Sequence, residues 1–172
     1  MQHPSIARIR ELIRSLKYVV SLHASEELED DNLSILDFEN IVLTGQIIER
    51  QRDRNTQEVK CVVSGSRLTV SPPKSSSKSA RPVASSSLPF TVSDELCAFC
   101  GKSGVHLREV TRSFRVAGSL LLIERIPQVS CPHCGESYFT AQTMHEIERI
   151  KRLRKSLAVK TTVPVATFLA AA

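Results

Sequence analysis

Two short cysteine motifs constrain this chain more than any other feature of its sequence. They read Cys97-Ala-Phe-Cys100-Gly and Cys131-Pro-His-Cys134-Gly, with thirty residues between Cys100 and Cys131. Two cysteines three positions apart place both sulfurs on one side of a turn, and the following glycine allows a backbone that directs amide N–H groups at them. Four thiolates from two such turns suit tetrahedral Zn²⁺. The sequence therefore predicts one zinc ion held by Cys97, Cys100, Cys131 and Cys134.

A site filled by four thiolates has no open position for water, so its zinc is expected to be structural. The competing interpretation is four free thiols or redox pairs, but a redox C-x-x-C pair normally opens a helix, and neither pair is expected to do so. His133 lies inside the second motif and is an alternative ligand. Cys61 stands alone in an apolar stretch, where we expect a half-buried thiol.

A serine-rich stretch divides the chain. Residues 71–87 include eight Ser, three Pro and no acidic residue, and so bury too little apolar surface to fold by themselves. We expect an N-terminal unit over 1–70, a linker over 71–95 and a zinc unit over 96–172. The first unit has a net charge of −2 and the last a net charge of +6, which favours different partners for the two.

The N-terminal unit is predicted to be α+β. Apolar residues spaced by three and four predict a helix over 6–16, and a β-prone run over 18–22 precedes an acidic helix over 23–30. Ser34 is expected to begin the next helix, with Asp37 in its first turn and Gly45 at its end. Strands are then predicted over Gln46–Arg52 and 58–63, joined across residues 53–55.

The zinc unit is predicted to be a small β-hairpin followed by a helix. Strands over His106–Val116 and 120–126 are expected to meet at Ala117-Gly118-Ser119. A helix over 140–157 and a final strand over 163–169 should follow. The helix carries one apolar side, which consists of Met144, Ile147, Ile150, Leu153 and Leu157.

The same helix carries five cations: Arg149, Lys151, Arg152, Arg154 and Lys155. They could contact RNA or DNA phosphates, form an ordinary solvated face, or dock an acidic protein partner. The chain has no Trp and two Tyr, so few side chains could stack on bases, and this favours the solvated face.

The C-terminal half resembles the YgiT-type zinc-finger family, the zinc-binding part of MqsA-like antitoxins. The resemblance covers residues 95–165 and rests on ELCAFCGKSG, on IPQVSCPHCGESYFTAQTMHEIERI and on the spacing between them. It implies a structural zinc and a domain that binds and neutralises a ribonuclease toxin. Full-length family members add a DNA-binding helix-turn-helix, for which this chain has no counterpart, so operator binding is not implied.

Residues 5–66 resemble domain-of-unknown-function family 4258, which is regarded as toxin-like. The resemblance rests on His23–Leu28, on residues 35–45 and on the short runs around Arg50 and Lys60. It makes a RelE-like ribonuclease fold a plausible analogy. RNA cleavage of that type needs a base, an acid and cations near the phosphate, for which the candidates are His23, Arg50, Arg52 and Lys60. The alternative for these residues is helix-start, packing and solvated positions.

Family 4258 continues with two more strands where this chain has its serine-rich linker. Serine codons of the TCN type, read one base earlier, encode only Phe, Leu, Ile or Val, so a shifted frame over 74–91 would restore an apolar hairpin. One hypothesis is therefore a one-base slip that fused two adjacent genes; the other is a natural linker. As translated, the N-terminal unit is expected to be truncated and to expose the strand edge that the missing strands would cover.

These observations predict a toxin–antitoxin-like fusion whose zinc domain is a structural, protein-interaction module. The alternatives are a ribonuclease in residues 1–70 and a nucleic-acid-binding protein that uses the basic helix. The sequence has neither a signal peptide nor an apolar run long enough to cross a membrane, so a cytoplasmic location with no membrane partner is expected.

Overall fold

The computed structural model describes residues 5–52, 59–68, 84–85 and 96–164. These residues form a mixed α+β protein with antiparallel sheets, which confirms the predicted mixture of helices and strands. The elements, in chain order, are α1 (Ile6–Arg14), β1 (Val19–Ser21), α2 (Leu22–Asp30), α3 (Ile35–Thr44), β2 (Gln46–Arg52), β3 (Val59–Ser64), β4 (Ala84–Ser85), β5 (His106–Val116), β6 (Ser119–Ser130), β7 (Ser137–Thr140) and α4 (Ala141–Leu157).

Helix α3 begins and ends where the sequence predicts. The Ser34 side chain accepts the Asp37 N–H, and the Asp37 carboxylate accepts the Ser34 N–H, so the first turn is closed from both sides. At the other end, a Cβ on Gly45 would collide with the carbonyl oxygens of Ile41 and Ser64. Glycine at this position therefore lets β2 leave the helix in direct contact with the end of β3.

The long hairpin of β5 and β6 forms at the predicted turn. Ala117 and Gly118 both have positive φ values, 50° and 79°, as a two-residue turn of type I′ requires. A register shift between Val110 and Arg112 bends the hairpin, and Arg125 on β6 has a φ of 55° beside it.

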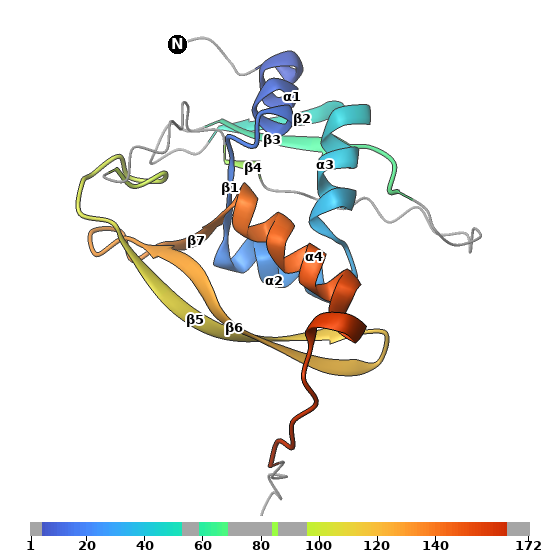
Figure 1. The fold of residues 1–172 in the computed structure, drawn as a ribbon. Coiled ribbons are helices and arrows are strands. Elements are labelled where there is room, and N and C mark those ends of the chain that lie inside the picture. The colour runs from blue at the N-terminus through green and yellow to red at the C-terminus, as the bar shows by residue number, and fades with distance from the viewer. Residues whose placement is uncertain (1–4, 53–58, 69–83, 86–95, 165–172) are drawn as a thin grey trace, which may run out of the picture.

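The two halves of the chain are joined in one sheet. Its strand order is β1-β7-β6-β5, and β1 pairs with β7 from Val19 opposite Thr140 to Ser21 opposite Tyr138. A second sheet has the order β2-β3-β4. In Figure 1, α4 lies between α3 and the β5–β6 hairpin, and it contacts both. We call residues 5–68 the N-terminal segment and residues 96–164 the C-terminal segment.

The main hydrophobic core also contains side chains from both segments. Val20 and Ile35 come from the N-terminal segment, and Phe139 at its centre is completely buried. The other buried members come from the C-terminal segment: Phe114, Leu121, Ile123, Ile126, Met144 and Ile147. The fold therefore brings residues separated by more than a hundred positions into one core.

Among the described residues, a second, smaller core has buried members from the N-terminal segment alone. Its buried members are Ile9, Ile13, Val42 and Cys61. The prediction of a half-buried Cys61 is wrong, because the side chain is 1% exposed. Helices α1 and α3 and strand β3 surround this thiol, so Cys61 is a core residue and lies outside the group formed by the other four cysteines.

The β3 edge that was expected to be exposed is partly covered. The linker region contributes β4, which pairs with Lys60 and Cys61 of β3. Residues 53–55, the expected turn, lie outside the described residues, as do 165–169 of the expected last strand. Val163 and Pro164 are not in a strand. None of the described helices has both the length and the apolar content needed to cross a membrane.

Candidate metal centre

The four predicted cysteines meet in one cluster. The sulfur atoms of Cys97, Cys100, Cys131 and Cys134 all lie within 4.8 Å of one another. Two sulfur–sulfur distances between the turns are 3.7 Å: Cys97 Sγ to Cys134 Sγ, and Cys100 Sγ to Cys131 Sγ. A tetrahedral zinc with Zn–S bonds of about 2.3 Å would separate its sulfurs by about 3.8 Å. The donor set and its spacing therefore fit one tetrahedral metal ion.

The two turns have the same backbone geometry. In each, the N–H of the first cysteine donates to the carbonyl five residues later, at 2.8 and 2.9 Å, and the glycine N–H donates back to the carbonyl of that cysteine, at 2.9 and 3.0 Å. Gly101 and Gly135 have φ values of 68° and 76°, which other residues adopt less readily. The glycine at the end of each motif is thus explained by the turn that presents its sulfurs.

The surroundings of the sulfurs differ between the turns. The Phe99 N–H donates to Cys97 Sγ over 3.4 Å, but burial dominates there and raises the pKa of the Cys97 thiol. In the second turn, hydrogen bonding from the Cys134 backbone lowers the pKa of Cys131 to about 6. Cys97 and Cys131 are buried, whereas Cys134 is exposed. The cluster therefore lies at the surface, with its first cysteines facing inward.

Tyr138 connects the metal centre to the sheet. Its side chain is 1% exposed, and its hydroxyl oxygen accepts the Ala98 N–H over 3.3 Å. The Phe99 ring packs against it with 5.5 Å between the ring centres. Tyr138 belongs to β7 and lies opposite Ser21 of β1. One buried residue thus contacts the first cysteine turn while its backbone takes part in the pairing with the N-terminal segment.

The alternative ligand, His133, is not part of the four-cysteine cluster. His133 is exposed and lies outside the cluster of four sulfurs. Its ring nitrogen Nε2 instead lies near Gly104, 3.8 Å from where a Cβ on that glycine would be. Among the residues that the structure describes, the potential metal-binding group consists of the four cysteines.

The four predicted catalytic residues lie on three elements, α2, β2 and β3. His23 is on α2, where its side chain is 82% exposed and lies 3.3 Å from Glu27. Arg50 is exposed on β2, and Lys60 is half-buried on β3 next to Cys61, the residue opposite Arg50. Arg52 ends β2, and its side chain lies outside the described part of the structure. No described hydrogen bond or ion pair joins His23 to Arg50 or Lys60, and a catalytic role for these residues stays a prediction.

A polar cluster that the sequence analysis missed joins the two segments. Glu39 on α3 accepts a hydrogen bond from the Tyr18 hydroxyl over 2.6 Å, and the same carboxylate oxygen lies 2.8 Å from His145 Nε2 on α4. The Glu39 side chain is 13% exposed and that of His145 is 33% exposed. Burial and the neighbouring Glu39 carboxylate raise the pKa of Tyr18, which keeps its hydroxyl protonated as a donor.

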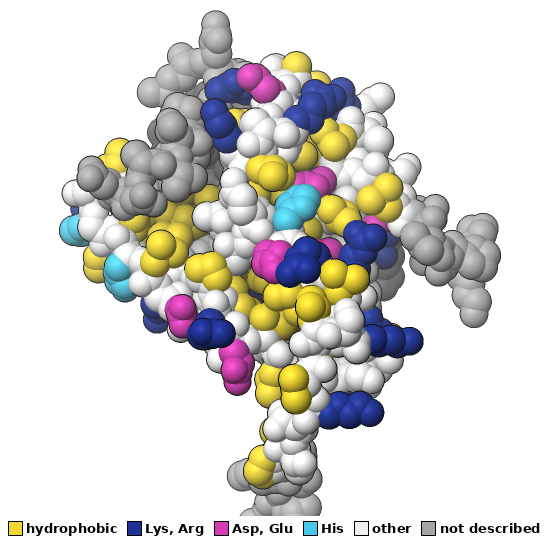
Figure 2. Space-filling view, viewed as in Figure 1, with side chains coloured by type: hydrophobic (Ala, Val, Ile, Leu, Met, Phe, Trp, Pro, Cys, Tyr) yellow, Lys and Arg dark blue, Asp and Glu magenta, His cyan; other side chains and the backbone are white. Residues whose placement is uncertain are grey.

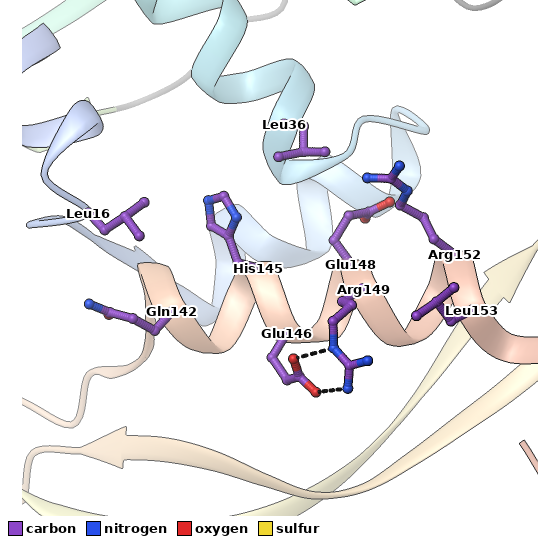
Figure 3. Close-up of a pocket in the computed structure, with 9 residues that line it drawn as sticks. All are labelled: Leu16, Leu36, Gln142, His145, Glu146, Glu148, Arg149, Arg152 and Leu153. Atoms are coloured by element: carbon purple, nitrogen blue, oxygen red, sulfur yellow. Dashed lines mark hydrogen bonds and ion pairs between the residues drawn. The ribbon is translucent and has the colours of Figure 1, made fainter. Parts of the chain in front are cut away.

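This cluster borders a groove of about 580 Å³ between α3 and α4. Figure 3 shows His145 pointing from α4 toward Leu16 and Leu36, while Glu146 and Arg149 pair on another side of the helix. That pair is bidentate, at 2.6 and 2.7 Å. The full lining is Leu16, Leu36, Gln142, His145, Glu146, Glu148, Arg149, Arg152 and Leu153.

The basic helix is partly neutralised by its surroundings. Besides the pairing of Arg149, the Lys151 ammonium lies 4.4 Å from the centre of the Phe114 ring. Figure 2 shows acidic and basic side chains beside one another, among apolar ones, on the face that carries α4. This distribution favours the solvated-face interpretation over a continuous phosphate-binding surface.

The comparisons with known proteins bear on the N-terminal segment. A family model described as a domain of unknown function, DUF4258, matches residues 20–70. The match supports the predicted resemblance from β1 onward and leaves α1 outside it. None of the curated proteins and none of the solved structures compared with the chain matches it.

Proposed function

We propose that this chain is a toxin–antitoxin-type fusion in which the zinc unit is a structural interaction module that holds the toxin-like N-terminal unit in a masked state. The observation that carries the proposal is the sheet that the two segments share. Strand β7 of the zinc unit pairs with β1, and Phe139 and Val20 then lie together in the common core. Strand pairing of this kind is a general mode of protein recognition.

Polar contacts on both sides of this pairing support a specific interface. On one side, Glu39 of the N-terminal segment binds Tyr18 and His145, as described above. On the other, the guanidinium of Arg112 on β5 lies 3.3 Å from the Glu26 carboxylate on α2 and 5.7 Å from the centre of the Phe139 ring. The Glu39–His145 pair is partly buried, so it penalises any other docking geometry, because a shifted partner would leave these groups unpaired.

The motifs of the C-terminal segment supply the second argument. Its resemblance to the YgiT-type family implies a structural zinc at the four cysteines and a domain that neutralises a toxin. In this chain the segment that carries the resemblance pairs, through β7, with the segment matched by DUF4258. The proposed partner is therefore a protein, and it is present in the same chain.

Growth of a bacterial host tests the proposal. Residues 1–95 would be expressed under an inducible promoter, alone or together with residues 96–172 from a second plasmid. We expect growth arrest from the first fragment and recovery with the second, because the masked surface is covered again. The full chain should leave growth unaffected.

The matched control is residues 96–172 with Cys131→Ser, which lacks one metal ligand and should fail to rescue growth. Retention of the second fragment on a tagged first fragment gives a readout that does not depend on toxicity. A first fragment that neither slows growth nor retains its counterpart would contradict the proposal.

A further inference from the structure

Strand β7 contacts both β1 and the buried cluster that contains Cys97 and Cys131. Its first residue, Ser137, lies opposite Ser130, the residue that precedes Cys131, with 2.9 Å between the two hydroxyl oxygens. Its next three residues, Tyr138–Thr140, pair with β1. The second metal-binding turn, which carries Cys131 and Cys134, therefore connects β6 to β7, the strand that pairs with β1.

The pairing of β7 with β6 is very short. Two register pairs, Val129 opposite Tyr138 and Ser130 opposite Ser137, connect these strands. Two pairs are too few to hold a strand in water by themselves, so β7 depends on its neighbours at both ends. At one end that support is the turn closed by Cys131 and Cys134, and at the other it is α4 and the shared core.

Tyr138 adds a direct connection to the first turn. Its hydroxyl accepts the Ala98 N–H, and its ring belongs to the same buried cluster as Cys97 and Cys131. Structural zinc sites contribute binding free energy to folding, since the ligands are not arranged without the ion. Loss of the ion would loosen both turns and remove two supports of β7 at once.

We propose that metal occupancy of the four-cysteine site controls whether the N-terminal segment is masked. With the ion bound, β7 covers the β1 edge and Phe139 seals Val20 and Ile35. Without it, β7 separates from β1, and the β1 edge and this apolar surface open to solvent and to another partner. The inference rests on the proposed function, because it assigns a means of regulation to the same docking interface.

Loss of the metal is expected to expose only the β1 side of the N-terminal segment. The small core around Ile13, Val42 and Cys61 has no buried member from the C-terminal segment. It should keep α1, α3 and the β2–β3 pair together when the metal leaves. This core therefore serves as an internal control for global unfolding.

Hydrogen exchange of the full chain tests the inference, with one equivalent of Zn²⁺ or with excess EDTA. We expect peptides covering Val19–Ser21 and the start of α2 to exchange at least about tenfold faster in EDTA, while peptides from β2 and β3 change by less than about twofold. Adding Zn²⁺ back should restore the protection of β1. Acceleration confined to residues 96–104 and 131–137, with β1 still protected, would overturn the inference, as would equal acceleration of every peptide.

The outcomes separate this inference from the proposed function. If β1 exchanges freely even with Zn²⁺ bound, the docking interface itself is wrong. If β1 is protected with and without Zn²⁺, docking stands and metal control is wrong. A Cys131→Ser variant should reproduce the EDTA pattern in the presence of Zn²⁺, whereas Cys61→Ala, which removes a buried thiol outside the site, should retain zinc and protect β1. Zinc titration of the unmodified chain decides the matter if Cys131→Ser does not fold.

Discussion

The two hydrophobic cores of this protein differ in how far apart their residues lie in the sequence. The core around Cys61 is built from residues 9–61, and the core around Phe139 combines residues 20–35 with residues 114–147. Figure 1 places α1, α3 and the β2–β3 pair at one end of the molecule, the β5–β6 hairpin at the other, and α4 between them. The N-terminal segment therefore buries one of its sides by itself and depends on the C-terminal segment for the other.

This difference explains how one chain can contain two units and still form one continuous fold. The core around Cys61 can stay folded when the C-terminal segment separates, because its described buried residues all come from the N-terminal segment. The core around Phe139 needs both segments, so its exposure can be regulated by whether they are docked. Substitutions in the two cores, and at the contacts between segments, should therefore have separable effects.

Removing the metal should have the largest effect. Structural zinc sites bind with about 10–16 kcal/mol, and that free energy is available only to the folded C-terminal segment. Excess EDTA should therefore abolish the cooperative melting of the C-terminal segment. Near-UV circular dichroism of the two tyrosines, Tyr18 and Tyr138, and hydrogen exchange in β6 would measure this loss. A melting curve identical in EDTA and Zn²⁺ would show that the four cysteines contribute no metal-dependent stability.

Truncation at the centre of the shared core comes next. Phe139→Ala removes a completely buried ring and should destabilise the protein by about 3–5 kcal/mol in urea unfolding. Exchange should accelerate in β1 as well as in β6, because both segments lose the same contact. The matched change in the other core, Ile13→Ala, should cost about 2–5 kcal/mol and mainly accelerate exchange in α1 and β3. Identical exchange patterns for the two variants would show that the cores are not distinct.

The polar cluster between the segments should have an intermediate effect. Glu39→Gln keeps the shape of the side chain but weakens its acceptance from Tyr18 and His145, at a cost of about 1–3 kcal/mol. Tyr18→Phe removes one of the two hydrogen bonds and should cost about 1 kcal/mol. A double-mutant cycle between Glu39 and His145, measured by urea unfolding, should give a non-zero coupling. Strict additivity would mean that this contact contributes nothing to docking.

Zinc affinity should depend on pH in two steps. Burial raises the pKa of Cys97, so this thiol loses its proton when zinc binds at neutral pH. The pKa of Cys131 is lowered to about 6, so its thiolate is present above that pH and must be formed from the thiol below it. Below pH 6, zinc binding should therefore release one additional proton, from the Cys131 thiol. The binding free energy should then weaken with falling pH by about 1.4 kcal/mol more per pH unit than it does above pH 6. Competition titrations with a chromogenic chelator would measure the slope, and a constant slope through pH 6 would contradict the assignment.

The smallest effect is expected at the exposed pair on α4. Glu146 and Arg149 are both about half exposed, and although the pair lowers the pKa of Glu146, such contacts are screened by water and salt. Arg149→Ala should leave the urea midpoint and the exchange of β1 unchanged. A clear acceleration at β1 would mean that this face of α4 takes part in docking.

Local features of the fold could be predicted from the sequence because their signals are local. The two C-x-x-C-G turns, the cap at Ser34 and the turn at Ala117-Gly118 each depend on a few neighbouring residues, and each forms as predicted. The buried state of Cys61 was underestimated, since its covering helices come from elsewhere in the segment. The position of β4 in a serine-rich stretch had no apolar pattern to indicate it.

The docking interface could not be predicted in the same way. Strand β7 has four residues, and its partner lies about 120 positions away, so neither periodicity nor a turn connects them. Glu39 and His145 are ordinary surface residue types on two predicted helices, and only the packing of α3 against α4 brings them together. The catalytic candidates were predicted from a family resemblance, and their role stays a prediction.

Cutting the linker in the folded chain tests the central claim most directly. A specific protease site would be inserted among residues 74–80 of the full chain, and the zinc-loaded protein would be cleaved and passed over a size-exclusion column with light scattering. If β1 and β7 hold the segments in one sheet, both fragments should elute together as a single 1:1 particle with the mass of the uncut chain. Elution as two separate species at micromolar concentration would show that the segments are held only by the linker, and would contradict the account.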